Sequence, residues 1–211
     1  GCPSRFYTTG PVCCDWPDDT EVTMISTDTG TDTLPSSFKR LNLAQALGAL
    51  NDNVIKLIIV FFLISHFGQE RAATVAAIGS AAFVAPFLLF SALAGSLADR
   101  FPKGWIIVRV KALEVGIALL AVAGLLIASP LLLGVVIFLL GTHSALFAPA
   151  KYGVVPELVA REELSRANSF LEMWSFLAIV GGTALAPFLV QLAGGRHGLA
   201  LLAGVAVALC G

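Results

Sequence analysis

Long apolar runs separated by short polar connections occupy the chain from residue 41 onward. Most runs approach the length of about 20 residues that an α-helix needs to cross a hydrocarbon core about 30 Å thick. The pattern predicts six membrane-spanning helices, at 41–66, 72–97, 105–128, 131–147, 168–192 and 198–211. The last run has 14 residues and is too short to cross the core, so we expect the sixth helix to be truncated and the sequence to be a fragment.

The first 40 residues follow a different pattern, with nine charged residues, many Ser and Thr, and no long apolar run. Such a segment buries too little apolar surface to fold by itself, so we expect 1–40 to be disordered and 41–211 to form the membrane domain. Met24 opens the polar stretch that leads into the first apolar run. We hypothesise that translation starts at Met24, in which case 1–23 is not native. The cysteines show no metal-ligand spacing, so no metal site is expected.

Composition agrees with a membrane protein, because 57% of the residues are hydrophobic and only 13% are charged. Soluble domains are about 45–50% apolar and about 25% charged. The formal net charge is -1 and basic residues do not cluster with aromatic ones, so a nucleic-acid partner is not expected.

Basic residues fall mainly on one side of the predicted helices, and this predicts the orientation. The other side has only Arg71 and Arg196. The nine basic residues of the richer side are Lys39, Arg40, Arg100, Lys103, Arg109, Lys111, Lys151, Arg161 and Arg166. The N-terminus should therefore be cytoplasmic. The short connections at 67–71, 129–130 and 193–197 predict antiparallel hairpins on the outer side.

The connection between the second and third helices, residues 95–103, reads Gly-Ser-Leu-Ala-Asp-Arg-Phe-Pro-Lys. It resembles the cytoplasmic signature of the major facilitator superfamily, Gly-x-Leu-Ala-Asp-Arg-x-Gly-Arg-Lys/Arg, although the second Gly and the last basic residue are replaced. Gly95 would let another helix approach closely, and Asp99 can accept hydrogen bonds. Arg100 and Lys103 would face anionic lipid, so the string is either a conformational latch or a basic turn that only fixes topology.

Two further strings narrow the resemblance. Residues 47–53 read Leu-Gly-Ala-Leu-Asn-Asp-Asn, and 147–158 read Phe-Ala-Pro-Ala-Lys-Tyr-Gly-Val-Val-Pro-Glu-Leu. With the Glu-Leu-Ser-Arg-Ala-Asn continuation at 163–168, they resemble the bacterial lysophospholipid transporter family. That resemblance implies the N-terminal six-helix half of a major facilitator bundle in the bacterial inner membrane. In that family the transporter stands alone or is fused ahead of an acyltransferase and an acyl-carrier-protein ligase.

The first predicted helix carries Asp52 near its middle, where a charge costs about 2.5–3.5 kcal/mol on insertion scales. Lys56 lies one turn later on the same face. These two side chains either neutralise each other and pin the helix, or line a polar route together with Asn51. In the second case Asp52 would meet an ammonium group and Lys56 a phosphate.

The cytoplasmic end of the fourth helix carries Lys151 and Tyr152. Residue types alone favour a topology signal with an aromatic belt, whereas the family resemblance favours lipid phosphate binding by Lys151. Pro149 and Gly153 suggest a broken helix end at this point. Residues 156–167 are predicted to form a short separate helix.

Four more polar residues lie within or beside the predicted spans. Asn168 and Glu172 share a face of the fifth helix and either complete the polar pathway or serve as a cap and a contact to a neighbouring helix. Lys111 and Glu114, three residues apart, are interpreted as a simple pair. His143 either joins a proton relay or bonds a neighbouring helix.

These interpretations predict a transporter that moves lysophospholipid inward by alternating access, with lipid as substrate and with no cofactor. Nucleophile elbows, zinc motifs and phosphate-binding loops of Walker form are missing from the sequence, so an enzyme is not expected. One alternative is a major facilitator carrier for a soluble small molecule. The other is the membrane domain of a lysophospholipid acyltransferase fusion.

Overall fold

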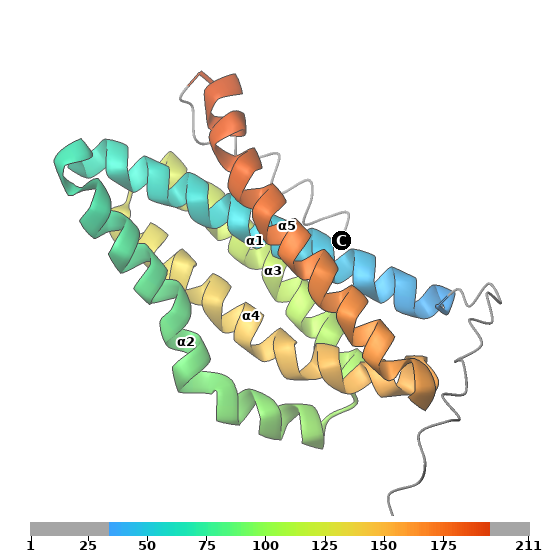
Figure 1. Ribbon diagram of the computed structural model, residues 1–211. Coiled ribbons are helices and arrows are strands. Elements are labelled where there is room, and N and C mark those ends of the chain that lie inside the picture. Colours follow the sequence, from blue (N-terminus) through green and yellow to red (C-terminus); the bar gives the residue numbers. More distant parts are fainter. Residues whose placement is uncertain (1–33, 195–211) are drawn as a thin grey trace, which may run out of the picture. The chain divides into compact units, whose positions relative to one another are not determined.

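The computed structural model describes residues 34–194, which belong to one compact unit. The predicted sixth helix at 198–211 and residues 1–33 of the segment 1–40 that was predicted to be disordered lie outside the described residues, whereas residues 36–40 are helical. The described part is all-α, and Figure 1 shows its elements. They are α1 (Ser36–Phe67), η1 (Gln69–Arg71), α2 (Ala72–Arg100), α3 (Lys103–Leu126), α4 (Pro130–Leu158), η2 (Arg161–Glu163) and α5 (Leu164–Leu192).

Five of the predicted spans are present as helices, but α1 begins at Ser36, earlier than the predicted start at residue 41. The reason is a small apolar cluster beneath this first turn. Phe38 is buried there with Leu34, against Val155 of α4 and Leu171 of α5. Packing therefore stabilises a helical turn that its polar composition alone did not predict.

The fourth helix is longer than predicted, and the broken end at 149–153 and the separate helix at 156–167 were wrong. α4 continues through Pro149 and Pro156 to Leu158, and only the single 3₁₀ turn Arg161–Glu163 precedes α5. Proline removes one backbone hydrogen bond, a cost that tertiary packing offsets when the flanking turns are buried. Ala150 and Val155, which lie between the two prolines, are both fully buried.

Four stretches are long and apolar enough to cross a membrane, namely Ser36–Phe67, Gln69–Arg100, Pro130–Leu158 and Arg161–Leu192. The remaining long helix, α3, carries four charged residues, which lower its hydropathy. These are Lys103, Arg109, Lys111 and Glu114. The described part therefore belongs to the all-α membrane class.

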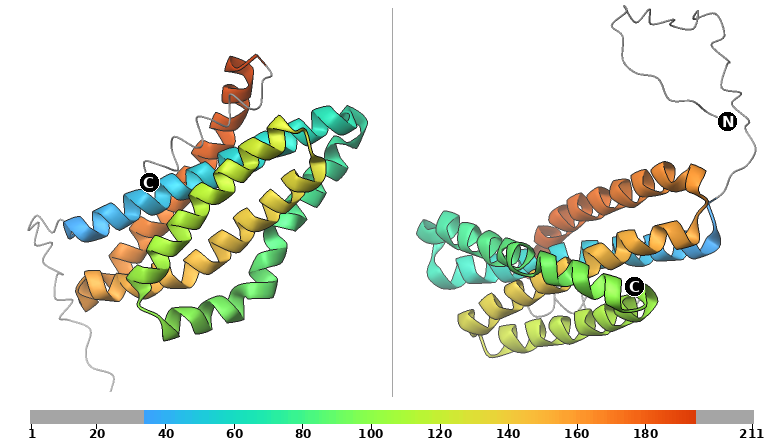
Figure 2. Two further views of the ribbon diagram at one scale, coloured as in Figure 1. Left: turned by 180° about the vertical axis from the view of Figure 1, so that it is seen from behind. Right: turned by 90° about the horizontal axis from the view of Figure 1, so that it is seen from below.

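Neighbours in sequence are not always the main packing partners. α1 packs chiefly on α5, whereas both α2 and α3 pack chiefly on α4. Figure 1 shows α1 and α2 diverging from the turn that joins them, and Figure 2 shows α3 beside α4 from behind. Glycines allow the contacts of α4 with α2 and of α5 with α1. A Cβ on Gly141 of α4 would collide with the Phe83 carbonyl group of α2. A Cβ on Gly182 of α5 would lie 2.7 Å from the Leu50 carbonyl oxygen of α1.

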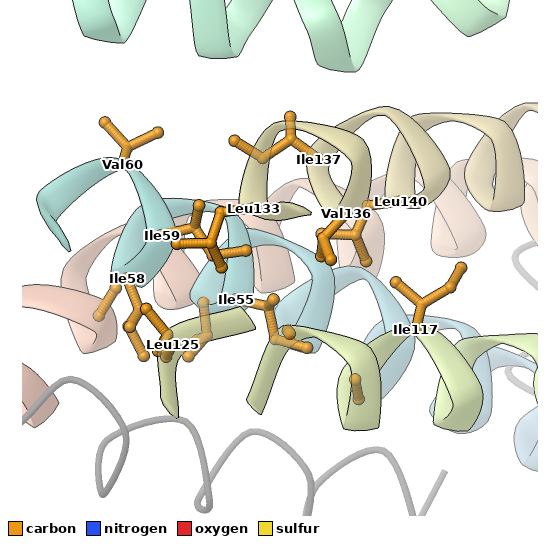
Figure 3. Close-up of a cluster of buried hydrophobic side chains, with 14 of the residues drawn as sticks. Ile55, Ile58, Ile59, Val60, Ile117, Leu125, Leu133, Val136, Ile137 and Leu140 are labelled. Carbon is orange, nitrogen blue, oxygen red and sulfur yellow. The ribbon is translucent and has the colours of Figure 1, made fainter. Parts of the chain in front are cut away.

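Apolar side chains form three clusters. The largest, drawn in Figure 3, joins the second half of α1 to α3 and α4 through residues such as Ile55, Ile117 and Leu140. A second cluster lies around Phe38, and a third joins α2, α3 and α4 around Ile106. The buried polar residues Asp52, Glu114, His143 and Lys151 lie between these clusters along their helices. The core therefore leaves a polar layer within the bundle.

Candidate functional site

A cavity of about 370 Å³ lies in this polar layer, and all five long helices line it. This volume is within the range of about 300–1,000 Å³ that is typical of small-molecule sites. Its polar lining residues are Gln45, Asp52, Asn53, Lys56, Lys111, Glu114, His143, Ser144, Lys151 and Ser175. Its bulky apolar ones are Phe83, Phe87, Phe147 and Ile179. The cavity can therefore receive a molecule with both a charged and an apolar part.

Asp52 lies halfway along α1, and its Oδ2 accepts a hydrogen bond of 2.9 Å from the Ser144 hydroxyl of α4. The same oxygen lies 3.6 Å from Nδ1 of His143. One of the two interpretations of the sequence expected Lys56 to form an ion pair with Asp52. The structure has no ion pair between these two side chains. Instead, the Lys56 ammonium group donates to Asn53 Oδ1 at 3.0 Å and lies 4.6 Å from the centre of the Phe83 ring.

Glu114 of α3 is fully buried and is contacted from three helices. Lys111 Nζ lies 3.0 Å from its Oε2, which confirms the pair that the spacing predicted. Asn51 of α1 donates to its Oε1 at 3.2 Å, and His143 Nε2 of α4 lies 3.7 Å from its Oε2. Lys111 also donates to the Ala44 carbonyl oxygen of α1 at 3.0 Å. The carboxylate therefore ties α3 to both α1 and α4.

Lys151 lies in the half of α4 that the sequence predicts to be cytoplasmic. The residue is buried, with only 9% exposed. Its ammonium nitrogen lies 3.4 Å from Gln45 Oε1 and 3.3 Å from Ser175 Oγ, which are long contacts for a charged donor. The nearest charge is Glu172 at 4.0 Å, and the ring centre of Tyr152 lies 4.7 Å away. An ammonium group has three N–H donors, so Lys151 retains capacity for an anionic ligand.

The charges that line the cavity do not balance. Three lysines and two carboxylates leave a formal charge of about +1 when His143 is neutral. In an environment of low dielectric constant this excess favours an anionic group. Among residues 34–194, no three His, Cys, Asp or Glu side chains are placed to hold a metal ion.

Of the candidates taken from the sequence, the structure places Asp52, Lys56 and Lys151 at the cavity and the others outside its lining. Asn51 is fully buried and contacts Glu114 instead of lining the cavity. The Tyr152 hydroxyl donates to Glu172, and this pair lies outside the lining.

Asn168 is inside α5 and exposed, and its side chain has no hydrogen bond in the described part of the chain. It is not a cap, because α5 begins at Leu164. Of the two roles proposed for the pair, Glu172 has the contact to a neighbouring helix and Asn168 has neither role here.

The signature string at 95–103 forms one ion pair. Lys103 Nζ lies 2.6 Å from Glu157 at the end of α4. The side chains of Asp99 and Arg100 are exposed and make no ion pair or hydrogen bond with any of residues 34–194. No other atom of the described residues would lie within 4 Å of a Cβ on Gly95, so the predicted close approach is not present among them.

Helical spacing could have identified several lining residues that the sequence analysis missed. Gln45, Gly48, Asp52 and Lys56 repeat at three- or four-residue intervals and therefore share one face of α1. The same spacing on α4 links Ser144, Phe147 or Ala148, and Lys151. Starting from Asp52 on α1 and from Lys151 on α4, this rule finds the parts of the cavity wall that these two helices supply.

One protein-family model, described as Major Facilitator Superfamily, matches residues 41–211. That match covers most of the chain and includes every lining residue of the cavity. It also includes the signature string at 95–103 and its partner Glu157.

Three similar curated proteins carry the name lysophospholipid transporter LplT. The chain is 31% identical over 186 residues to that of Escherichia fergusonii, covering 88% of this chain and 44% of the relative. It is 30% identical over 183 residues to those of Escherichia coli O139:H28 and Shigella boydii serotype 18, covering 87% of this chain and 43% of each. The resemblance inferred from the sequence is thus confirmed, and the chain spans less than half the length of these relatives.

Proposed function

This chain belongs to the Major Facilitator Superfamily, and from that premise we propose that it forms one half of a carrier for lysophospholipids. It is a multi-pass membrane protein, and its family indicates a carrier rather than an enzyme. The relatives that share about 30% of its residues are named for lysophospholipid transport, which supports this substrate class.

The observation that carries the proposal is the amphipathic lining of the cavity. A lysophospholipid has a phosphate, a polar head group and a single acyl chain. Lys151 has unused donor capacity for the phosphate, as argued from its long contacts to Gln45 and Ser175. Asp52 faces the same cavity and would meet the ammonium group of an ethanolamine head group.

The acyl chain requires an apolar route beside the polar one. Phe83 and Phe87 of α2, Phe147 of α4 and Ile179 of α5 supply an apolar wall of the same cavity. Ile179 is 39% exposed, so this wall reaches the protein surface. A single chain could therefore stay against apolar side chains while the head group occupies the polar layer.

Alternating access needs a second set of helices, because major facilitator halves rock against each other around a midplane site. The relatives are more than twice as long as their match to this chain, which is consistent with a second half of that kind. We place the protein in the bacterial inner membrane with a cytoplasmic N-terminus, as the distribution of basic residues predicts. Lipid would then move inward, from the outer to the inner leaflet.

Uptake by proteoliposomes that contain the whole natural gene product tests the proposal. Labelled lysophosphatidylethanolamine should accumulate, and Asp52→Ala or Lys151→Ala should each lower the initial rate at least about tenfold, because each loses a charge-assisted contact. Arg109→Ala is the matched control, because Arg109 stacks on Trp105 and does not line the cavity. Unchanged uptake in both cavity variants would contradict the proposal.

Two competitors separate the alternative functions. In the reconstituted uptake assay, competition by soluble glycerophosphoethanolamine or other soluble solutes, but not by lysolipid, would indicate a carrier for a soluble molecule. Reading the gene past codon 211 tests the acyltransferase fusion, because an acyltransferase or adenylate-forming domain would then follow the membrane part. Such a fused acyltransferase would add an enzymatic activity downstream of transport without changing the role of this half.

A further inference from the structure

Lys151 lies between the cavity and a carboxylate outside it. Lys151 lines the cavity, whereas Glu172 of α5 does not. Lys151 Nζ lies 4.0 Å from Glu172 Oε1, and the Glu172 side chain is 43% exposed against 11% for that of Lys151. A charge-assisted hydrogen bond from an ammonium group to a carboxylate is about 2.7–2.9 Å long. Among residues 34–194, Glu172 is therefore the one carboxylate beside Lys151, and it is not bonded to it.

The Tyr152 hydroxyl group holds this carboxylate in place. It donates a hydrogen bond to Glu172 Oε1, the same oxygen that lies 4.0 Å from Lys151. Tyr152 and Glu172 belong to different helices, α4 and α5, so the bond fixes the carboxylate relative to α4. The centre of the Tyr152 ring lies 4.7 Å from Lys151 Nζ, so the ring also contacts the ammonium group. Tyr152 therefore touches both members of the charge pair.

The position of Glu172 determines how much of the Lys151 charge is available to a ligand. On the cavity side Lys151 has only long contacts, to Gln45 and Ser175. Opposite charges attract each other strongly where the dielectric constant is low. A carboxylate free to turn would therefore form a direct ion pair with Lys151 and occupy donors that a lipid phosphate needs. At 4.0 Å it leaves those donors open and remains close enough to pair with Lys151 after a phosphate has left.

We propose that Glu172 is a positioning residue that competes with the lipid phosphate for Lys151, and that the Tyr152 hydroxyl group limits this competition. The inference rests on the proposed function, which assigns the phosphate to Lys151. The phosphate displaces the carboxylate when lipid binds, and the carboxylate returns when lipid leaves. A cation without a partner is costly inside a protein, so this exchange favours release of the phosphate. The competition acts only on ligands that carry a phosphate.

Binding of lysophosphatidylethanolamine and of monoacylglycerol with the same acyl chain to the purified whole gene product tests this directly. Glu172→Gln removes the charge and keeps an acceptor for Tyr152. It should raise the affinity for the phosphate-bearing lipid about tenfold and leave monoacylglycerol unchanged. Tyr152→Phe frees the carboxylate and should lower the affinity for the phosphate-bearing lipid alone. Glu162→Gln is the matched control, because Glu162 is exposed in η2 and does not line the cavity.

The double variant Tyr152→Phe/Glu172→Gln shows whether the two residues act through one charge. It should bind the phosphate-bearing lipid as tightly as Glu172→Gln alone, because the hydroxyl group then has no carboxylate to restrain. A merely structural role would weaken both lipids in every variant. Unchanged or lower affinity in Glu172→Gln, or a loss from Tyr152→Phe that persists in the double variant, would overturn the inference. If Lys151→Met does not weaken binding of the phosphate-bearing lipid, the proposed function fails instead.

Discussion

Lys151→Met removes one charge from the cavity and keeps an unbranched side chain of similar length. The Lys151 ammonium group makes only long contacts, 3.4 Å to Gln45 and 3.3 Å to Ser175, so little stability is lost with it. A charge-assisted hydrogen bond to phosphate contributes about 1.5–3 kcal/mol. At about 1.4 kcal/mol per factor of ten, the affinity for a phosphate-bearing lysolipid should fall about 10- to 150-fold.

Two ligands and two proteins turn this into a thermodynamic cycle. Lysophosphatidylethanolamine and monoacylglycerol of the same chain length are titrated into wild-type and Lys151→Met protein, with Arg109→Gln as the control. The phosphate-bearing lipid should lose affinity in Lys151→Met, whereas monoacylglycerol should bind both proteins alike. Equal losses for both lipids would mean that Lys151 acts only by packing, and this would refute the assignment of the phosphate to Lys151.

Three further predictions concern packing and the cytoplasmic end. Gly182→Ala should lower the midpoint of thermal unfolding in detergent, because its Cβ would lie 2.7 Å from a carbonyl oxygen of α1 and overpacking costs about 1–3 kcal/mol; Gly134→Ala, with nothing within 4 Å, should not lower it. Lys103→Glu should reduce transport, and the exchanged pair Lys103→Glu/Glu157→Lys should restore it. The free energy of unfolding should change by about 1 kcal/mol or less, because both side chains are partly exposed. If the exchanged pair does not restore transport, loss of the ion pair is not the cause of the reduction. Gly48→Ala would place its Cβ 2.8 Å from the ammonium nitrogen of a lysine on α3, so lipid uptake should fall through displacement of that charge, and unchanged uptake would contradict the role of this close contact.

The sequence predicted the helices better than their ends. Runs of apolar residues fix where a chain can cross a bilayer, so the first five helices lie where hydropathy placed them. The ends depend on tertiary contacts that hydropathy does not contain. Phe38 extends α1 toward the N-terminus because it finds an apolar cluster. α4 continues past Pro149 because the turns that follow it are buried, at Ala150 and at Val155.

For the candidate site, the sequence likewise predicted some charged residues but not the residues that contact them. Asp52 and Lys151 were predicted because a charge in an apolar run is costly and needs a reason. Their partners could not be predicted from spacing within one helix. Asp52 contacts residues of α4 and not Lys56 on its own helix, and Glu114 accepts from Asn51 of α1. Which helices meet at the polar layer is a property of the fold.

Water access to the cavity most directly tests the central claim, that the polar layer between the apolar clusters is a wet site for a lysolipid head group. Every cysteine of the whole gene product, including the four of this chain, is replaced by serine, and a single cysteine is introduced as Ala148→Cys in the cavity or as Leu133→Cys in the fully buried apolar cluster. A small water-soluble thiol reagent should label Ala148→Cys but not Leu133→Cys, and lysophosphatidylethanolamine should protect the first. If Ala148→Cys stays unlabelled, or is labelled equally with and without lysolipid, the cavity does not hold the head group and the account fails.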